Sequence, residues 1–540
     1  MNNKFSTFIN GIFSLIISQV LIKIFGVIYS LYLTNKTGFG DEGNAIYMSG
    51  YQIYALLLTI SSIGVPNAIA KLVSEKKERK DFINLDRIFK VALLIFGIIG
   101  FFGGIVLFSI SEFLAKHVIG IDDAVLSIKV LSPAIFFVSI VSVIKGYFNG
   151  IGKIIITAKI QFLEQVIKTI LTIIFVEITT TLTGNDVKIM AGAANFATTI
   201  ATFMSFVHIY YLYSKEIRLE FYIEGYTYKR EKLRDILNKV LNISLPMTFN
   251  AILSSFGKNI DSATVTKLLK NKMGETLARK KYGIISSKID ILISMPLAFN
   301  SSISTALIPE ISKMKERNDI DGVIKKIELS LLITFLIAIP YSFGLFFYSG
   351  RIFEILFPNA LEGDMLLKIG SFGVVFSMLT QTINAILQGL GKNKVPVYAS
   401  FFGVIIKLAS NLIFIPIKGI FEKGAIIGNV ISSITSFIIV SCILIKTIYI
   451  NNYILKVSLK IFINSFAMIF VSNFAYLILK KIEIKSKICS IISIGIAVIA
   501  YILGIFLIKI IKKDEIYKKA WNSQLQRFWD LENVEKSGKK

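Results

Sequence analysis

Four lysines lie inside long apolar stretches of this 540-residue chain. A charged side chain in hydrocarbon is costly and usually faces a protein interior or a water-filled cavity. The four are Lys23, Lys168, Lys288 and Lys407. Ammonium groups bind anions through charge-assisted hydrogen bonds, so a cavity that gathered these lysines would suit an anionic group such as a diphosphate. Other charged residues can reach the membrane surface instead, as we expect for Lys145, Lys258 and Glu177.

A polar stripe runs through the apolar stretch 159–182. It consists of Gln161, Glu164, Gln165, Lys168 and Thr172, at i, i+3, i+4, i+7 and i+11. This spacing is one face of a helix, and such a face cannot point to lipid. Glu164 and Lys168 could form a structural ion pair four residues apart, or they could line a cavity. The sequence leaves both roles open.

Two more apolar stretches show a polar face at the same spacing. In 8–34 it consists of Gln19, Lys23, Gly26 and Ser30, and in 240–266 of Asn250, Ser254, Gly257 and Asp261. Asp290 follows Lys288 by two residues, so Lys288 could pair with it instead of facing a cavity. The candidate substrate-binding residues are therefore Lys23, Lys288, Lys168, Glu164, Asp261, Lys407, Gln19, Asn250 and Asp290.

Signals for catalysis or metal binding are weak. The two histidines are His117 and His208, and no cluster of His, Cys and carboxylate residues has metal-ligand spacing. Cys442 and Cys489 both lie in apolar stretches and indicate no disulfide framework. We expect no metal, no cofactor and no enzymatic activity.

The composition places these residues in a membrane. The chain is 54% hydrophobic, with a mean hydropathy of +0.68, far more apolar than a soluble domain. Charge-free runs such as 46–70, 189–214 and 488–508 exceed the roughly 18 residues that span a bilayer as a helix. A transmembrane barrel would show alternating segments of about ten residues instead.

Counting shorter and charge-interrupted runs gives fourteen transmembrane helices and an all-α integral membrane protein. They are expected at 8–34, 46–70, 89–114, 125–148, 159–182, 188–213, 240–266, 282–312, 328–350, 366–388, 396–417, 424–446, 457–479 and 487–510. No cleavage pattern follows the first run, so we interpret it as a retained helix.

Charge in the loops predicts the orientation. The net charge is +25, and its lysines and arginines cluster in short loops, which favours a topology signal over a nucleic-acid partner. Loops after even-numbered helices are basic: 71–90 and 214–239 have seven Lys/Arg each, 313–326 five and the tail nine. Two loops do not fit this pattern, because 267–281 has six Lys/Arg and 480–487 has four. We expect a multi-pass protein of the cytoplasmic membrane with both termini in the cytoplasm.

A short pattern occurs twice. NGIGK at 149–153 returns as QGLGK at 388–392, and neither has the spacing of a phosphate-binding loop. At the same offset of 239, Gly150, Gly152 and Lys153 match Gly389, Gly391 and Lys392, while VPNAIAKLVS (65–74) aligns with ISTALIPEIS (303–312) at 238. The repeat indicates two six-helix lobes inserted in the same direction, related by an axis along the membrane normal. Gly-x-Gly-Lys is then a tight cytoplasmic turn in each lobe.

This repeat predicts five regions. They are an N-lobe at 1–214, a basic cytoplasmic linker at 215–239, a C-lobe at 240–450, two further helices at 451–511 and a basic cytoplasmic tail at 512–540.

Several motifs resemble a known family. GVPNAIAKLVSE (64–75), IQFLEQVIK (160–168), YGIISSKIDILISMPLAFNSSISTALIPEIS (282–312) and the GLGK turn resemble stage V sporulation protein B and MurJ-type flippases, of the multidrug/oligosaccharidyl-lipid/polysaccharide exporter superfamily. The resemblance implies a two-lobed monomer that moves the lipid-linked cell-wall precursor lipid II across the membrane by alternating access. Its partners would be a polyprenyl-diphosphate-linked saccharide and membrane lipids, without nucleic acid.

The resemblance also assigns roles. It implies that Lys23 and Lys288 occupy the basic positions of the first and eighth helices that engage the diphosphate, and that Lys168 stands where relatives often carry arginine. A second arginine of the first helix is absent, with Ser30 near its place. The last two helices would form a groove for the polyprenyl tail. Transport would be driven by Na⁺, H⁺ or the membrane potential.

Other functions remain open. The chain could export a different polyprenyl-linked oligosaccharide, or act as a multidrug antiporter. It could also be a membrane scaffold for wall or spore-cortex assembly, although a scaffold does not need intramembrane polar stripes.

Overall fold

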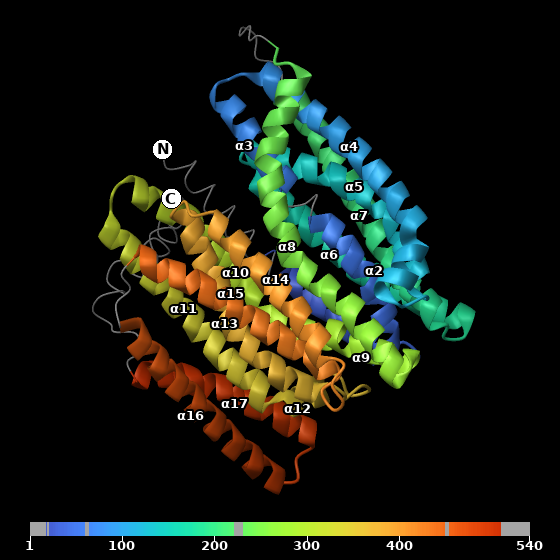
Figure 1. Cartoon of the computed structure of the whole chain (residues 1–540), viewed down its shortest axis with the longest axis vertical. Coiled ribbons are helices and arrows are strands. Elements are labelled where there is room, and N and C mark those ends of the chain that lie inside the picture. The colour runs from blue at the N-terminus through green and yellow to red at the C-terminus, as the bar shows by residue number, and fades with distance from the viewer. Residues whose placement is uncertain (1–17, 19–20, 60–63, 221–229, 449–452, 509–540) are drawn as a thin grey trace, which may run out of the picture.

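The computed structural model describes residues 18, 21–59, 64–220, 230–448 and 453–508. Every regular element in these residues is a helix, and long helices run side by side in two bundles (Figure 1). Gln19, residues 221–229 of the predicted linker and the predicted tail lie outside the described residues, as does the side chain of Asn250.

The helices of the first half are Leu21–Asn35, called the first helix below, and α2 (Gly40–Thr59), α3 (Val65–Glu78), α4 (Phe82–Phe113), η2 (Leu114–Ile119), α5 (Ala124–Gly150), α6 (Ile154–Thr183) and α7 (Val187–Glu220). Those of the second half are α8 (Leu233–Met273), α9 (Glu275–Gly283), η3 (Ile284–Ile289), α10 (Asp290–Glu316), α11 (Ile320–Phe347), α12 (Ser349–Leu356), α13 (Asp364–Gly389), α14 (Lys394–Phe414) and α15 (Glu422–Thr447). Two helices follow, α16 (Tyr453–Lys481) and α17 (Ser486–Leu507).

Eleven of these helical stretches are long and apolar enough to cross a membrane, and each falls on a predicted span. The other three predicted spans differ for separate reasons. Residues 1–17 and 60–63 interrupt the description of the first two. The third lies on α8, which carries many charged residues. The all-helical membrane fold is confirmed, and the count of fourteen stays a prediction.

Helices of each half pack mainly against one another. In the first half, α4 and α7 both pack on α5, and α6 packs on α7. In the second half, α13 packs on α10, α11 and α15, while α14 packs on α15. The last two helices pack on each other and border the second half through α11 and α12. Figure 1 shows them at the outer side of that bundle, away from the first half.

The Gly-x-Gly-Lys segments make the same turn in both halves. Gly152 and Gly391 have φ of +87° and +81°, a conformation that disfavours other residues. In each turn the lysine amide then bonds back to the helix, Lys153 to the Phe148 carbonyl and Lys392 to that of Leu387, both at 2.8 Å.

A matching contact holds each turn to a neighbouring helix. Lys77 donates to the Ile151 carbonyl at 2.8 Å, and Lys315 donates to the Leu390 carbonyl at 2.7 Å. These pairs are related by the offsets of 238 and 239 found in the sequence. The equivalent contacts support the interpretation of an internal repeat.

Helix α8 connects the two halves. Its 41 residues give a length of about 60 Å at 1.5 Å per residue. Near its start, Ile236 and Val240 pack with Ala68 and Ile88 of α3 and α4. Further along it packs on α14, and it ends beside α9 (Figure 1). Because α8 begins at Leu233, the helix takes up the end of the segment predicted as a linker.

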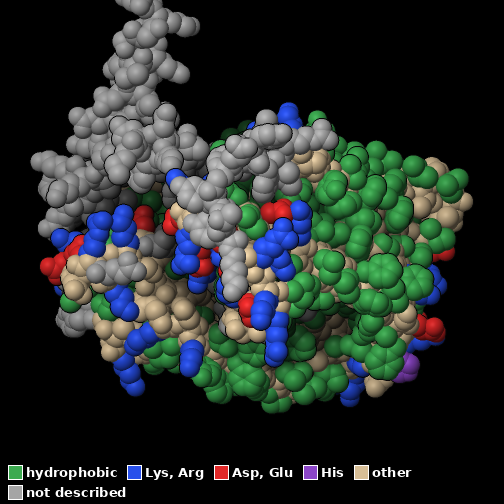
Figure 2. Space-filling view, turned by 90° about the horizontal axis from the view of Figure 1, so that it is seen from above, with side chains coloured by type: hydrophobic (Ala, Val, Ile, Leu, Met, Phe, Trp, Pro, Cys, Tyr) green, Lys and Arg blue, Asp and Glu red, His purple; other side chains and the backbone are tan. Residues whose placement is uncertain are grey.

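The surface suits a bilayer. Large apolar side chains on α4, α16 and α17 are exposed, including Phe102, Phe470 and Phe506 at 59%, 72% and 70%. Figure 2 shows Lys and Arg side chains gathered on one part of the viewed face, next to a broad hydrophobic part. Exposed phenylalanine in this density indicates contact with lipid rather than water.

Candidate functional site

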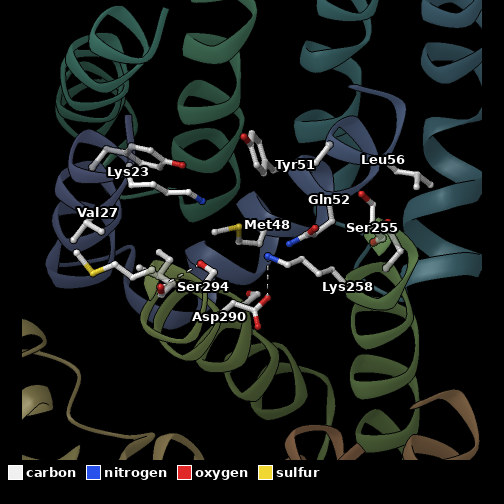
Figure 3. A pocket seen from close by; sticks show the side chains of 17 residues that line it. Lys23, Val27, Met48, Tyr51, Gln52, Leu56, Ser255, Lys258, Asp290 and Ser294 are labelled. Carbon is white, nitrogen blue, oxygen red and sulfur yellow. Dashed lines mark hydrogen bonds and ion pairs between the residues drawn. The ribbon is translucent and has the colours of Figure 1, made fainter. Parts of the chain in front are cut away.

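A cavity of about 380 Å³ lies between the two halves. The first helix and α2 line it from the first half, and α8, η3 and α10 from the second (Figure 3). Its size is within the range of small-molecule sites, about 300–1,000 Å³. We call it the central cavity.

The central cavity has more positive than negative groups. Lys23 from the first helix and Lys258 from α8 both line it, and Asp290 is the carboxylate on its wall. Lys258 lies 3.7 Å from Asp290, an interaction drawn in Figure 3. Lys23 has no ion pair of its own among the described residues. The cavity therefore presents two cations from opposite halves and one anion.

Aromatic residues separate Lys168 from this cavity. Tyr29 and Tyr51 line the cavity, whereas Lys168 is buried on α6 behind them. The Lys168 ammonium lies 4.0 Å from the centre of the Tyr51 ring and 5.0 Å from that of Tyr29. Such contacts stabilise a cation through the negative faces of the rings. Lys168 therefore supports the cavity wall from behind and does not line the cavity.

The predicted ion pair between Glu164 and Lys168 is wrong. Glu164 instead lies 3.8 Å from Lys145 of α5, and Lys168 faces the tyrosines. The stripe still points inward, because Lys168 and Thr172 are 5% and 0% exposed. The i, i+4 spacing allowed a pair on one helix, but Glu164 and Lys168 each interact with residues of neighbouring helices.

Lys288 does not line the central cavity, which corrects the expectation that it faces Lys23 there. Its ammonium lies 2.8 Å from Asp41, at the start of α2, and donates to the carbonyls of Ala360 and Glu362 at 2.6 and 3.2 Å. Both ionic side chains are almost fully buried. The alternative pairing with Asp290 is wrong as well, since Asp290 interacts with Lys258.

Further polar contacts join the halves at the end of the molecule where Lys288 meets Asp41. We call this end the contact end. Arg279 of α9 lies 2.5 Å from Asp123, and Thr266 donates to the Ile119 carbonyl of η2. The first helix takes part through Asn35, which donates to the Leu356 carbonyl at 2.7 Å. These contacts close the space between the halves at the contact end.

Asp261 and Lys407 form a second buried pair, this time inside the second half. Their charged groups lie 2.7 Å apart, and Asn411 and Asn429 also donate to the Asp261 carboxylate. Both residues line a separate cavity of about 350 Å³. The structure therefore places these two sequence candidates together, but away from Lys23.

Sequence reasoning missed Lys258, which it assigned to the membrane surface. One signal could have found it. Lys258 follows Asn250 and Ser254 at i+8 and i+4, so it belongs to the polar face already recognised on that helix. Among the described residues, no group of three or more His, Cys, Asp and Glu side chains could hold a metal ion.

Comparison with known proteins places this architecture in a family. Residues 8–315 match the profile of the polysaccharide biosynthesis protein family. The chain belongs to this family. Residues 246–413 also match the MatE family.

Curated relatives are consistent with that membership. The chain is 24% identical over 449 residues to lipid II flippase MurJ of Bacillus subtilis, covering 80% of this chain and 81% of the relative. It is 22% identical over 527 residues to stage V sporulation protein B of the same organism, covering 94% and 97%.

Solved structures share the fold. Lipid II flippase MurJ in an inward closed conformation aligns with a TM-score of 0.67, at 17% identity, over 92% of this chain and 99% of that one. An inward-facing multidrug resistance MATE family transporter aligns with a TM-score of 0.62, at 16% identity, over 79% and 95%. This family member is therefore a multi-pass membrane protein with the fold that these transporters share.

Proposed function

We propose that the protein flips a polyprenyl-diphosphate-linked saccharide, lipid II in the first instance, across the cytoplasmic membrane by alternating access. The observation that carries this proposal is the central cavity, where Lys23 and Lys258 approach from opposite halves. Two cations can bind one diphosphate through charge-assisted hydrogen bonds. When the halves rock, a site made from both can pass its ligand from one end to the other.

The two ends of the molecule differ, and the difference supports an orientation of the structure in the membrane. At the contact end, α9 and η3 of the second half pack on α2, and Lys288 pairs with Asp41, while at the other end the start of α8 packs on α3 and α4. The basic segment 71–90 lies at the opposite end, beside the start of α8, whereas the basic segment 267–281 belongs to the contact end. If that basic end and both termini are cytoplasmic, the structure is closed toward the outside. The fourteen-helix, two-lobe organisation with a groove for the lipid tail belongs to the same proposal, and Na⁺, H⁺ or the membrane potential would drive the cycle.

The test is transport of labelled lipid II by the full chain reconstituted in liposomes. Lys23→Ala and Lys258→Ala should each slow flipping at least about tenfold, because each contact to a charged group contributes about 1.5–3 kcal/mol. Lys→Arg at either site should retain more activity than Lys→Ala. Lys368→Ala is the matched control, since Lys368 lies on α13 and pairs with Asp364 outside the central cavity.

Full flipping by the Lys23→Ala/Lys258→Ala double variant would contradict the diphosphate site. The same liposomes separate the substrates. Faster movement of another polyprenyl-linked saccharide than of lipid II would reassign the lipid.

Multidrug antiport is the second candidate, favoured by the MatE match over 246–413 and by the MATE fold likeness. An antiporter would accumulate a cationic dye in proteoliposomes with an imposed ion gradient. We expect no such accumulation, because the two lysines of the central cavity repel a cation.

A further inference from the structure

The cavity inside the second half, which we call the C-half chamber, adjoins the proposed diphosphate site but has been given no role so far. It has a volume of about 350 Å³ and lies among α8, α10, α13, α14 and α15. Lys258 and Asp290 line both this chamber and the central cavity. A single ligand could therefore extend from one space into the other past these two residues.

The charges of the two spaces differ. The chamber's remaining ionic residues, Asp261 and Lys407, neutralise each other at 2.7 Å, and Asn429 donates to the same carboxylate. The shared pair Lys258 and Asp290 is neutral as well. Two cations and two anions give the chamber no net charge, whereas Lys23 leaves the central cavity with an excess of one cation. An anion is favoured in the central cavity, and a neutral ligand in the chamber.

Serine hydroxyls give the chamber a defined hydrogen-bonding character. Ser432 donates to the Gly403 carbonyl at 2.7 Å, Ser436 to that of Ala399 at 3.1 Å, and Ser433 to its own helix at 2.9 Å. These hydroxyl protons are committed. The Ser433 oxygen also accepts from Ser377 at 2.9 Å, so it keeps one lone pair that can accept a further hydrogen bond, and the oxygens of Ser432 and Ser436 can accept as well. A ligand rich in hydroxyl or amide N–H donors matches such a wall.

We propose that the C-half chamber binds a sugar ring of the lipid-linked substrate while the diphosphate lies in the central cavity. This proposal rests on the proposed function. A saccharide is neutral, as the uncharged chamber requires, and its hydroxyl groups can donate to the serine oxygens. It is also attached directly to the diphosphate, so it can pass the shared wall while the diphosphate stays in the central cavity. Discrimination by such sites is strong, because a ligand without the matching donors leaves buried acceptors unpaired.

The experiment compares two lipids on the purified full-length chain in nanodiscs. One is a polyprenyl diphosphate with its saccharide, and the other is the same carrier without sugar. The wild type should bind the saccharide lipid at least about tenfold more tightly, the effect of a few neutral hydrogen bonds. Ser433→Leu, which fills the chamber and removes one acceptor, should reduce this ratio to about one and leave carrier binding unchanged.

Two further variants separate the role of the chamber from general damage. Ser433→Ala removes the hydroxyl without adding volume, so its ratio should fall between those of the wild type and Ser433→Leu. Thr435→Leu is the matched control on the same helix, because the Thr435 hydroxyl bonds to Ile431 of its own helix and does not line the chamber. It should keep the wild-type ratio.

The outcomes distinguish this inference from the proposed function. If Ser433→Leu keeps the wild-type ratio, or if the wild type binds both lipids equally, the saccharide proposal is overturned and the diphosphate site stands. Wild-type protein that binds neither lipid overturns both. An equal loss of carrier binding in Ser433→Leu would show damage to the central cavity and would also reject the chamber as a separate sugar site.

Discussion

The two buried lysine–aspartate pairs have similar distances, but one lies between the halves and the other lies within a single half. Lys288 and Asp41 lie 2.8 Å apart and join the second half to the first. Lys407 and Asp261 lie 2.7 Å apart, and both belong to the second half. In the alternating-access cycle proposed above, the first pair would have to break and the second would persist. Under that proposal, Lys288–Asp41 would be a conformational contact between the halves and Lys407–Asp261 part of a fixed core.

The cost of losing one partner should therefore differ between the pairs. A lone buried charge is expensive because it has lost its water without gaining a partner. Asp41 could regain water if the contact end opened. Asp261 lies inside the second half, where α8 and α14 pack together, so opening the contact end would not separate it from Lys407. The predictions below test this contrast.

The largest effect is expected inside the second half. Asp261→Leu leaves the Lys407 ammonium buried without a carboxylate, so the free energy of unfolding should fall by about 3–5 kcal/mol. Denaturant titration of the purified protein measures it. The double variant Asp261→Leu/Lys407→Met should recover most of the loss. A double variant as unstable as the single one would show that packing around the pair, rather than its charge, stabilises this region.

A smaller loss of stability is expected at the contact end, together with a change of conformation. Lys288→Met leaves Asp41 unpaired, and separation of the halves returns this carboxylate to water. We expect a loss of about 1–3 kcal/mol and about a tenfold larger population of the separated state. Spin labels at Lys116 and Leu361, one on each half, would report the longer distance. An unchanged distance distribution would mean that the pair does not control closure.

The smallest effect concerns an ionic cluster beside the start of α8. Lys76 pairs with Glu231 at 2.5 Å, and Lys239 pairs with the same carboxylate at 2.9 Å. Partial burial alone would raise the pKa of Glu231, but hydrogen bonds from the two lysines hold it below its ordinary value. Glu231→Gln should cost about 0.5–1 kcal/mol, and high salt should reduce this difference.

The same cluster predicts a dependence on pH. A carboxylate with a depressed pKa contributes stability above its unfolded pKa, about 4.3 for glutamate, and loses it as pH falls through the lower folded value. The difference in unfolding free energy between wild type and Glu231→Gln should therefore shrink below about pH 4. A difference that is constant down to pH 3 would contradict this assignment.

The Gly-x-Gly-Lys repeat is a feature that the sequence alone could predict. Glycines with lysine at the same spacing, 239 residues apart, predicted one tight turn in each half, and the lysine contacts to Ile151 and Leu390 bear out that equivalence. The turn depends on a local requirement for positive φ, so the local sequence encodes it. The eleven apolar helices that fall on predicted spans were predictable for a similar reason, because bilayer thickness fixes the length of an apolar helix.

The partners of the charged residues were decided by the tertiary structure. The sequence determined that Glu164, Lys168 and Lys288 lie on apolar helices, where the two lysines are buried and Glu164 is half-buried. It could not determine that Asp41, 247 positions before Lys288, would be its partner, or that Lys168 would face two tyrosines. Helical spacing constrains neighbours within about one turn, whereas contacts across helices depend on how whole bundles pack. For that reason the sequence could not show that Lys258 and Lys23 line the same cavity. Their proximity depends on the position of α8 between the halves.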